Sequence, residues 1–116
     1  KKEILSLNRL SYALPKNLRI MKNSINQGIK VKMLVPFTKN SIMNIKKWQN
    51  IGANIRKYDE SKYGPIGTRL SVYDKKIARI TFGEPDVNRE EDYITLWAES
   101  PYFANILRNY LIRKYK

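Results

Sequence analysis

An arginine and an aspartate five residues apart form the strongest chemical feature of this chain. In the run GTRLSVYDKK, Arg69 lies near the start of an alternating apolar and polar stretch, and Asp74 lies where that stretch ends. A guanidinium group binds phosphate or carboxylate through two parallel hydrogen bonds, so Arg69 is a candidate anion-binding residue. The alternative is structural: Arg69 pairs with a nearby acid, Asp74 or Glu99, and Asp74 is an ordinary turn residue. The sequence leaves both interpretations open.

The composition excludes several kinds of catalysis. The 116 residues include no cysteine and no histidine. Disulfides, thiolate catalysis and every Ser–His or Cys–His arrangement are therefore excluded. The carboxylates of Asp59, Asp74 and Glu99 lack the spacing of metal ligands, which makes a metal-dependent phosphodiesterase or nuclease the weakest hypothesis. We expect no catalytic residue, no metal and no cofactor.

The charge is strongly positive, with 23 Lys and Arg against 10 Asp and Glu and a formal net charge of +13. Such an excess belongs either to a solvated basic surface or to a protein with an anionic partner, above all nucleic acid. The candidates for nucleic-acid contact are Lys46, Lys47, Arg56 and Lys57. No run approaches the ~18 apolar residues of a membrane span, and the start lacks a signal-peptide profile. We therefore expect a cytoplasmic protein with no membrane partner.

The hydrophobic pattern predicts strands and helices that alternate through the first half of the chain and strands that follow one another in the second. Apolar residues at i, i+4 and i+7 indicate helices, and strict alternation indicates strands. Asn40 or Ser41 is the expected N-cap of the second helix, and Ser100 followed by Pro101 that of the last. The predicted strands are 4–7, 29–35, 53–58, 69–73, 76–82 and 93–97, the helices are 15–28, 41–52 and 101–114, and 59–67 is a loop.

This order, β-α-β-α-β-β-β-β-α, predicts one α/β domain over residues 1–116, a mixed sheet flanked by helices. The last predicted helix carries apolar residues in two adjacent rows, which we interpret as a core-facing stripe. Trp97 and Glu99 lie where a strand ends before that helix, a place where ligands bind in open α/β sheets. The alternatives are that Trp97 is a core aromatic residue and that Glu99 supports the first turn of the helix.

Four stretches resemble a known family. They are NQGIKVKMLVP, NIGANIRKYDE, GTRLSVYDKKIARITFG and DYITLWAESPYFANILRNYL, of which the last two are the most specific. Together they resemble the phospholipase D-like domain of archaeal TrmB-type transcriptional regulators, in which such a domain follows an N-terminal winged helix-turn-helix. The resemblance covers nearly the whole chain and implies a phospholipase D-like mixed sheet. Since the chain starts without Met and shows no helix-turn-helix pattern, we expect a fragment that lacks this N-terminal domain.

The resemblance also explains the GTRLSVYDKK run. Active phospholipase D-type enzymes carry His-x-Lys-x4-Asp there, and the matching positions in this chain are Gly67, Arg69 and Asp74. The nucleophilic histidine is missing, so the phosphohistidine mechanism is impossible. The resemblance implies a non-catalytic effector-sensing or dimerisation domain of a transcriptional regulator. Its implied partners are a second copy, DNA through the absent N-terminal domain, and a small anionic effector at Arg69, Asp74, Trp97 and Glu99. The alternative is a basic domain that itself contacts nucleic acid.

Overall fold

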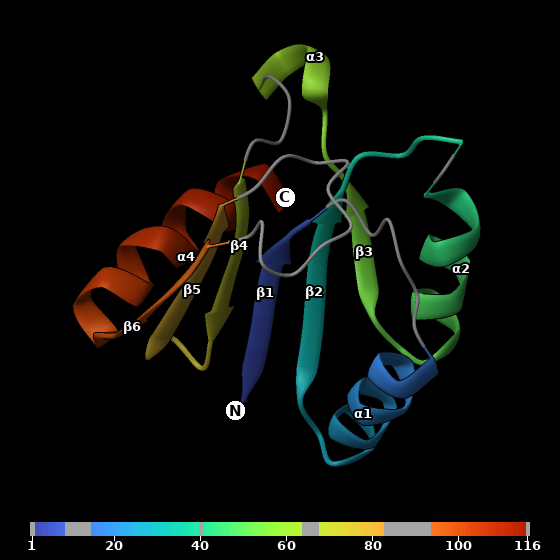
Figure 1. The fold of residues 1–116 in the computed structure, drawn as a ribbon, viewed down its shortest axis with the longest axis horizontal. Helices are drawn as coiled ribbons and strands as arrows, with labels where there is room; N and C mark the ends of the chain where they lie inside the picture. The colour runs from blue at the N-terminus through green and yellow to red at the C-terminus, as the bar shows by residue number, and fades with distance from the viewer. Residues whose placement is uncertain (1, 9–14, 40, 64–67, 83–93, 116) are drawn as a thin grey trace.

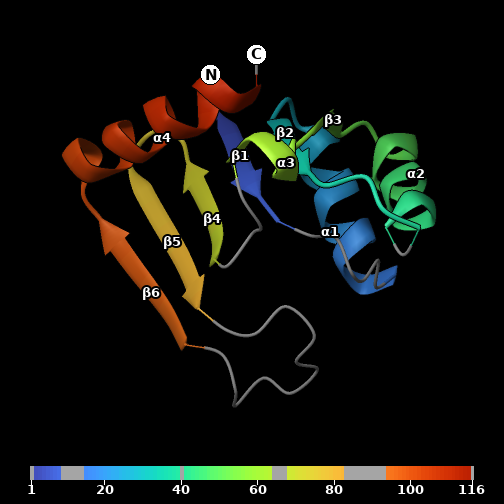
Figure 2. The same cartoon turned by 90° about the horizontal axis from the view of Figure 1, so that it is seen from above.

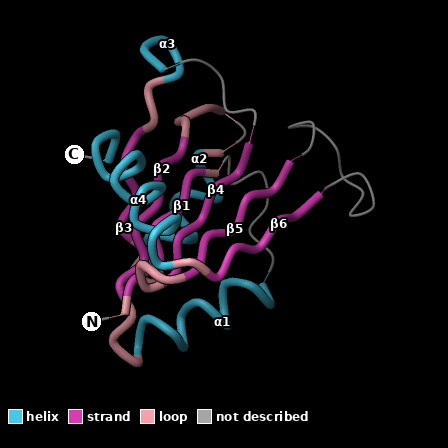
Figure 3. Tube along the Cα trace, turned by 90° about the vertical axis from the view of Figure 1, so that its left-hand side faces the viewer, coloured by secondary structure: helices cyan, strands magenta, loops and turns pink. Residues whose placement is uncertain are grey.

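The computed structural model describes residues 2–8, 15–39, 41–63, 68–82 and 94–115 and shows a six-stranded sheet with helices on both sides (Figure 1). The strand order is β3-β2-β1-β4-β5-β6, which the tube in Figure 3 follows from one edge to the other. The elements are β1 (Glu3–Leu7), α1 (Pro15–Asn26), β2 (Lys30–Val35), α2 (Ile42–Asn50), β3 (Asn54–Lys57), α3 (Glu60–Tyr63), β4 (Thr68–Tyr73), β5 (Ile77–Phe82), β6 (Ile94–Glu99) and α4 (Pro101–Tyr115).

Strand β1 joins a parallel half of the sheet to an antiparallel half. It pairs parallel with β2 and antiparallel with β4, and β2 pairs parallel with β3. The pairs β4–β5 and β5–β6 are antiparallel. The mixed sheet is confirmed, and so is the predicted succession of elements along the chain apart from α3. The predicted loop 59–67 is wrong in one part, because α3 forms there, and its first turn is held by the Asp59 carboxylate, which accepts the Ser61 amide at 3.1 Å.

Alternation along the strands divides the core between the two faces of the sheet. Helix α4 lies on one side, and α1 and α2 lie on the other, next to β1, β2 and β3 (Figure 2). The buried residues on the α4 side are Leu5, Leu7, Leu34, Tyr58, Val72, Ala104 and Leu111. Those on the α1 and α2 side are Val31, Met33, Val35, Ile45, Trp48 and Ala53. Among the described segments, no helix covers this second side of β4, β5 and β6.

The two predicted helix caps have different outcomes. The Ser100 hydroxyl accepts the Phe103 amide at 3.2 Å, so the predicted cap of α4 is confirmed. Ser41 occupies the N-cap position of α2 but makes no side-chain cap there. Its hydroxyl instead accepts the Thr38 amide at 2.9 Å and donates to the Pro36 carbonyl at 2.9 Å, because the preceding chain folds back over it. Ser41 is therefore the N-cap residue, as one of the two predicted candidates, but without a side-chain capping bond; Asn40 lies outside the described residues.

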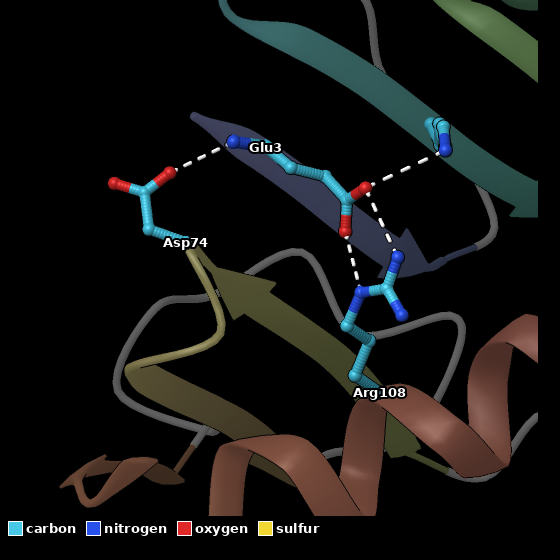
Figure 4. A network of polar contacts seen from close by, with 4 residues as sticks. Glu3, Asp74 and Arg108 are labelled. Carbon is cyan, nitrogen blue, oxygen red and sulfur yellow. Dashed lines mark hydrogen bonds and ion pairs between the residues drawn. The ribbon is translucent and has the colours of Figure 1, made fainter. Parts of the chain in front are cut away.

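The side chain of Glu3 links β1 to α4 and β2 (Figure 4). Arg108 donates from Nε to Oε1 at 2.8 Å and from Nη2 to Oε2 at 3.3 Å, and the Lys32 ammonium lies 3.4 Å from Oε2. The Arg108 hydrogen bond, together with both positive charges, lowers the pKa of Glu3 although burial opposes the shift. The same carboxylate raises the pKa of Arg108. A largely buried acid thus holds three elements together.

Asp74 closes the β4–β5 hairpin onto the start of β1. Its carboxylate oxygen Oδ1 accepts the Glu3 amide at 2.8 Å, and its own amide donates to the Glu3 carbonyl at 2.8 Å (Figure 4). Asp74 and Lys75 have φ values of +54° and +60°. Two successive left-handed residues are typical of tight hairpin turns, and aspartate tolerates that conformation better than most residues. In the folded chain Asp74 therefore has a structural role.

The Arg108→Leu variant tests the Glu3 link. It leaves a largely buried carboxylate with Lys32 alone, so we expect the free energy of unfolding near pH 7 to fall by about 2 kcal/mol. The pKa of Glu3 in the folded chain lies below its ordinary 4.5, so the stabilisation is complete above that pH and is lost as the pH falls through the folded pKa. Urea unfolding at about pH 7 and about pH 3 should show the difference between variant and unmodified chain shrinking in acid. Arg113→Leu, on an exposed position of α4, is the control; an equal loss there contradicts the assignment.

The Asp74 side chain gives a second test. Asp74→Ala removes the acceptor for the Glu3 amide and places alanine at a positive φ, so we expect a loss of about 2 kcal/mol in urea unfolding. Asp74→Asn keeps an acceptor oxygen and a residue that tolerates this conformation, and should lose less than about 1 kcal/mol. If Asp74→Ala unfolds at the same urea concentration as the unmodified chain, the hairpin bond is not stabilising.

Candidate functional site

The antiparallel half of the sheet presents an open face on the side opposite α4. Val72 and Ala78 are fully buried on the α4 side, so the residues that alternate with them point the other way. The pairing of β4 with β5 and of β5 with β6 sets these residues in three rows, which we call the open sheet face. The rows are Arg69, Thr81 and Thr95; Ser71, Arg79 and Trp97; and Tyr73, Ile77 and Glu99.

A pocket of about 370 Å³ lies where the open sheet face meets α1. Its volume is in the range of sites for small molecules. Four aliphatic side chains and Trp48 provide apolar parts of its wall. Its polar lining comes from Ser6, Asn8, Asn17, Arg69, Ser71 and Arg79, together with the hydroxyl-bearing Tyr73. Two arginines, Arg69 and Arg79, are among the described lining residues, which include no Asp or Glu.

Arg79 is positioned by aromatic rings. Its Cζ atom lies 5.6 Å from the ring centre of Trp97 and 6.0 Å from that of Tyr73, and the two rings stack with centres 5.9 Å apart at 19°. Its Nη2 atom lies 3.5 Å from the Ser71 hydroxyl, a long hydrogen bond. Cation–π contacts of this kind orient a guanidinium. They leave its N–H groups, which lie in the plane of the guanidinium itself, available as donors.

Two buried polar atoms belong to side chains of the pocket wall. The Ser6 hydroxyl and the Trp48 indole N–H have no hydrogen-bond partner among the described residues. Ser6 is 4% exposed and Trp48 is 7% exposed, and such buried groups are normally paired because their desolvation is costly. The interior of the pocket wall is therefore more polar than its aliphatic residues suggest.

The structure brings three of the four predicted ligand residues, Arg69, Trp97 and Glu99, onto the open sheet face. Arg69 lines the pocket, and Trp97 lies on the same face next to Arg79, 59% exposed. Trp97 is thus not the core aromatic residue of the alternative prediction. Asp74 is bonded to the Glu3 backbone instead of lining the pocket, and Glu99 is exposed at the end of β6, opposite Ile77. Gly67, the position of the missing histidine, lies outside the described residues.

Sequence reasoning missed Ser6, Trp48 and Arg79. For Arg79 a signal existed, because the predicted hairpin places it on the same face as Arg69 when the alternation of the two strands is followed across the turn. Ser6 and Trp48 carried no such signal. They come from a strand and a helix distant in sequence from Arg69, and only the packing of α2 against the sheet places Trp48 in the same wall as Ser6 and Arg69.

The four predicted nucleic-acid contacts do not form one surface. Lys46 and Lys47 are exposed on α2, which packs against the face opposite α4. Arg56 lies on the α4 side of β3, with its Cζ atom 5.4 Å from the ring centre of Tyr115. Lys57 follows Arg56 in β3 and, by alternation, points to the other side of the sheet.

Arg56 belongs to a cluster at the C-terminal end of α4, which we call the basic–aromatic cluster. Lys114 has its ammonium 3.9 Å from the ring centre of Tyr110 and 4.5 Å from that of Tyr63. The Lys62 ammonium lies 5.3 Å from the Tyr63 ring, so one aromatic ring contacts two cations. The members of the cluster are Lys32, Arg56, Lys62, Tyr63, Tyr110, Lys114 and Tyr115.

The carboxylates of the metal hypothesis lie in separate places. Asp59 precedes α3, Asp74 lies in the β4–β5 turn and Glu99 ends β6. Among the described residues, no group of three or more acidic, histidine or cysteine side chains is placed to hold a metal ion. No helix in the described part of the chain has the length and apolar character needed to cross a membrane.

Comparison with known proteins shows a likeness to a solved structure. No family model and no curated protein matches the chain. The solved structure of TrmBL2 is similar, with a TM-score of 0.63 and 13% sequence identity over 96% of this chain. That structure is described as an archaeal chromatin protein that shows a novel mode of DNA binding, and the chain covers 42% of its length. At this identity the likeness shows the fold: the chain has the mixed α/β fold of part of an archaeal TrmB-like protein.

Proposed function

We propose that this chain is a non-catalytic, effector-binding domain of an archaeal TrmB-type regulator and that the pocket at the open sheet face receives a small anion. One observation carries the proposal: Arg69 and Arg79 line the same pocket. An oxyanion in the pocket would accept charge-assisted hydrogen bonds from guanidinium groups of this kind. The absence of histidine from the chain supports binding without phosphohistidine chemistry.

The regulatory part of the proposal rests on the fold. TrmBL2 is described as binding DNA, and this chain covers 42% of it. We infer that this chain likewise belongs to a DNA-associated regulator of the TrmB type and that DNA contact is made mainly by a winged-helix domain outside this sequence. An effector in the pocket would contact α1, β1 and β4 together and stabilise their packing. Such a change in rigidity can be transmitted to a neighbouring domain.

Association with a second copy is part of the same proposal and rests on α4. Two apolar rows of α4 were predicted to face the core. One row contains the fully buried Leu111, whereas the other row is exposed. That row consists of Tyr102, Ile106 and Tyr110, which are 81%, 54% and 49% exposed. An exposed apolar row of this kind marks a surface that associates. Sedimentation velocity measures the oligomeric state, and a strictly monomeric chain at high concentration contradicts this part.

The Arg69→Ala variant tests anion binding. We expect the affinity for inorganic phosphate, measured by isothermal titration calorimetry, to fall about tenfold or more, because one charge-assisted pair of hydrogen bonds is lost. Arg69→Lys should keep part of the affinity, since it keeps the charge without the fork of donors. The thermal unfolding midpoint is measured in parallel. Lower stability with unchanged phosphate affinity would show that Arg69 has a structural role, and an equal loss of affinity in the control Arg113→Ala would show a diffuse charge effect.

A second candidate function is direct contact with nucleic acid, favoured by the basic–aromatic cluster. Exposed cations beside aromatic rings are typical of surfaces that bind the phosphate backbone and stack bases. A contact between this cluster and the phosphate backbone of DNA would add to DNA binding by the whole regulator. This function does not involve the pocket, but it shares Tyr110 with the exposed row of α4.

Salt titration of DNA affinity tests the cluster. The affinity of the chain for a duplex should fall steeply with salt, and Lys62→Ala with Lys114→Ala should weaken binding and reduce the slope of log K against log salt by about 2. The matched control is Lys46→Ala with Lys47→Ala, which removes the same charge from α2. Equal effects of the two pairs of substitutions would show that DNA affinity depends on net charge alone. No binding at low salt would exclude this function.

A further inference from the structure

Trp97 is exposed in β6, as are the apolar residues Ile94 and Leu96 of the same strand. Its side chain is 59% exposed in β6, and Tyr73 stacks against it with ring centres 5.9 Å apart. Strand aromatics normally contribute their large apolar area to a core or an interface. Trp97 instead offers a flat aromatic surface on the open sheet face, next to the two arginines of the pocket.

The three rows of the open sheet face place Arg69 and Glu99 on opposite sides of Trp97. Trp97 lies in the middle row beside Arg79, Arg69 lies in the row on one side of it, and Glu99 lies in the row on the other. Glu99 is the acidic residue of this face among the described residues, so an anionic group bound here would lie toward Arg69. Trp97 and Arg69 are two strands and two residues apart, which corresponds to about 12 Å between their Cα atoms. Long side chains at both ends reduce that span to the size of one nucleotide.

We propose that the open sheet face binds a nucleoside phosphate, with the base stacked on Trp97 and the phosphate held by Arg79 and Arg69 at the pocket. The inference rests on the proposed anion site and names the chemical class of its ligand. A planar base suits the exposed indole ring, because aromatic stacking is tolerant of which base is bound. A phosphate suits two guanidinium groups. Thr81 and Thr95, whose hydroxyls lie 3.3 Å apart, are in the same row as Arg69 and add polar groups to the open sheet face there.

The shared chemistry is a base joined to a phosphate, and it has two sources: a free nucleotide and a nucleotide within a single strand. Isothermal titration calorimetry of the whole chain with AMP, adenosine, inorganic phosphate and the single strand dT10 separates them. We expect AMP to bind about tenfold more tightly than inorganic phosphate, because one stacked base adds binding free energy. A preference for dT10 over AMP identifies the strand as the source, and a preference for AMP identifies the free nucleotide; both support the proposal.

Variants of Trp97 and Arg69 assign the residues. Trp97→Leu should remove the advantage of AMP over inorganic phosphate, whereas Trp97→Phe should keep part of that advantage. Arg69→Ala should weaken the binding of both AMP and inorganic phosphate. Since Trp97 is largely exposed, its replacement should leave the thermal unfolding midpoint unchanged, which keeps the comparison free of folding effects. Trp48→Phe, at the pocket lining on α2, shows whether a second tryptophan produces the same change and thereby contradicts the assignment.

Three outcomes overturn the inference. If inorganic phosphate binds with Arg69 dependence but AMP and dT10 bind no more tightly, the site is an oxyanion site alone and only the proposed effector function stands. If nothing binds with Arg69 dependence, that function fails as well. If Trp97→Leu converts a dimer to a monomer in sedimentation velocity and AMP does not compete with association, a second copy covers this face instead of a base.

Discussion

The fold of this chain depends on the first residue of β1, Glu3. Its carboxylate accepts two hydrogen bonds from Arg108 of α4 and pairs with Lys32 of β2, and its backbone is bonded to Asp74 in the β4–β5 turn. One residue thereby joins the parallel half of the sheet, the antiparallel half and the last helix. A largely buried carboxylate is favourable only when its charge is compensated, and here the compensation comes from elements far apart in sequence. The bonds between Glu3 and Asp74 lie at the end of the β1–β4 pairing, where Ile4 faces Tyr73.

The position of the candidate site is a consequence of unequal helix coverage. Helix α4 packs along one side of the sheet, against β1, β2, β4, β5 and β6, whereas the described helices on the other side, α1 and α2, lie beside β1, β2 and β3 (Figure 2). The open face of β4, β5 and β6 therefore carries polar and aromatic side chains, and the pocket forms at its boundary with α1. Ligand sites form at such boundaries because one wall is a rigid sheet and the other is a separate element.

Much of the architecture could be predicted because it is local. Alternation in 76–82 and the apolar spacing of the last helix depend on neighbours in sequence, and Ser100 caps that helix with a hydrogen bond three residues along. Two interpretations could not be settled in this way. Asp74 could be a ligand or a turn residue, and its bond to Glu3 joins positions 71 residues apart. The two apolar rows of α4 look alike in sequence, and only the packing direction decides that Leu111 is buried and Ile106 is exposed.

The sequence by itself determined what this chain lacks and what it can carry. A chain without histidine cannot form a phosphohistidine, and Arg69 in place of a lysine keeps a cation suited to oxyanions. The tertiary structure decided which groups meet that cation. Arg79 reaches the same pocket through the β4–β5 register, and Trp97 joins it through the β5–β6 register. Those neighbours could not be deduced from composition or periodicity, because a shift of one residue in either register would turn the same side chains to the opposite face of the sheet.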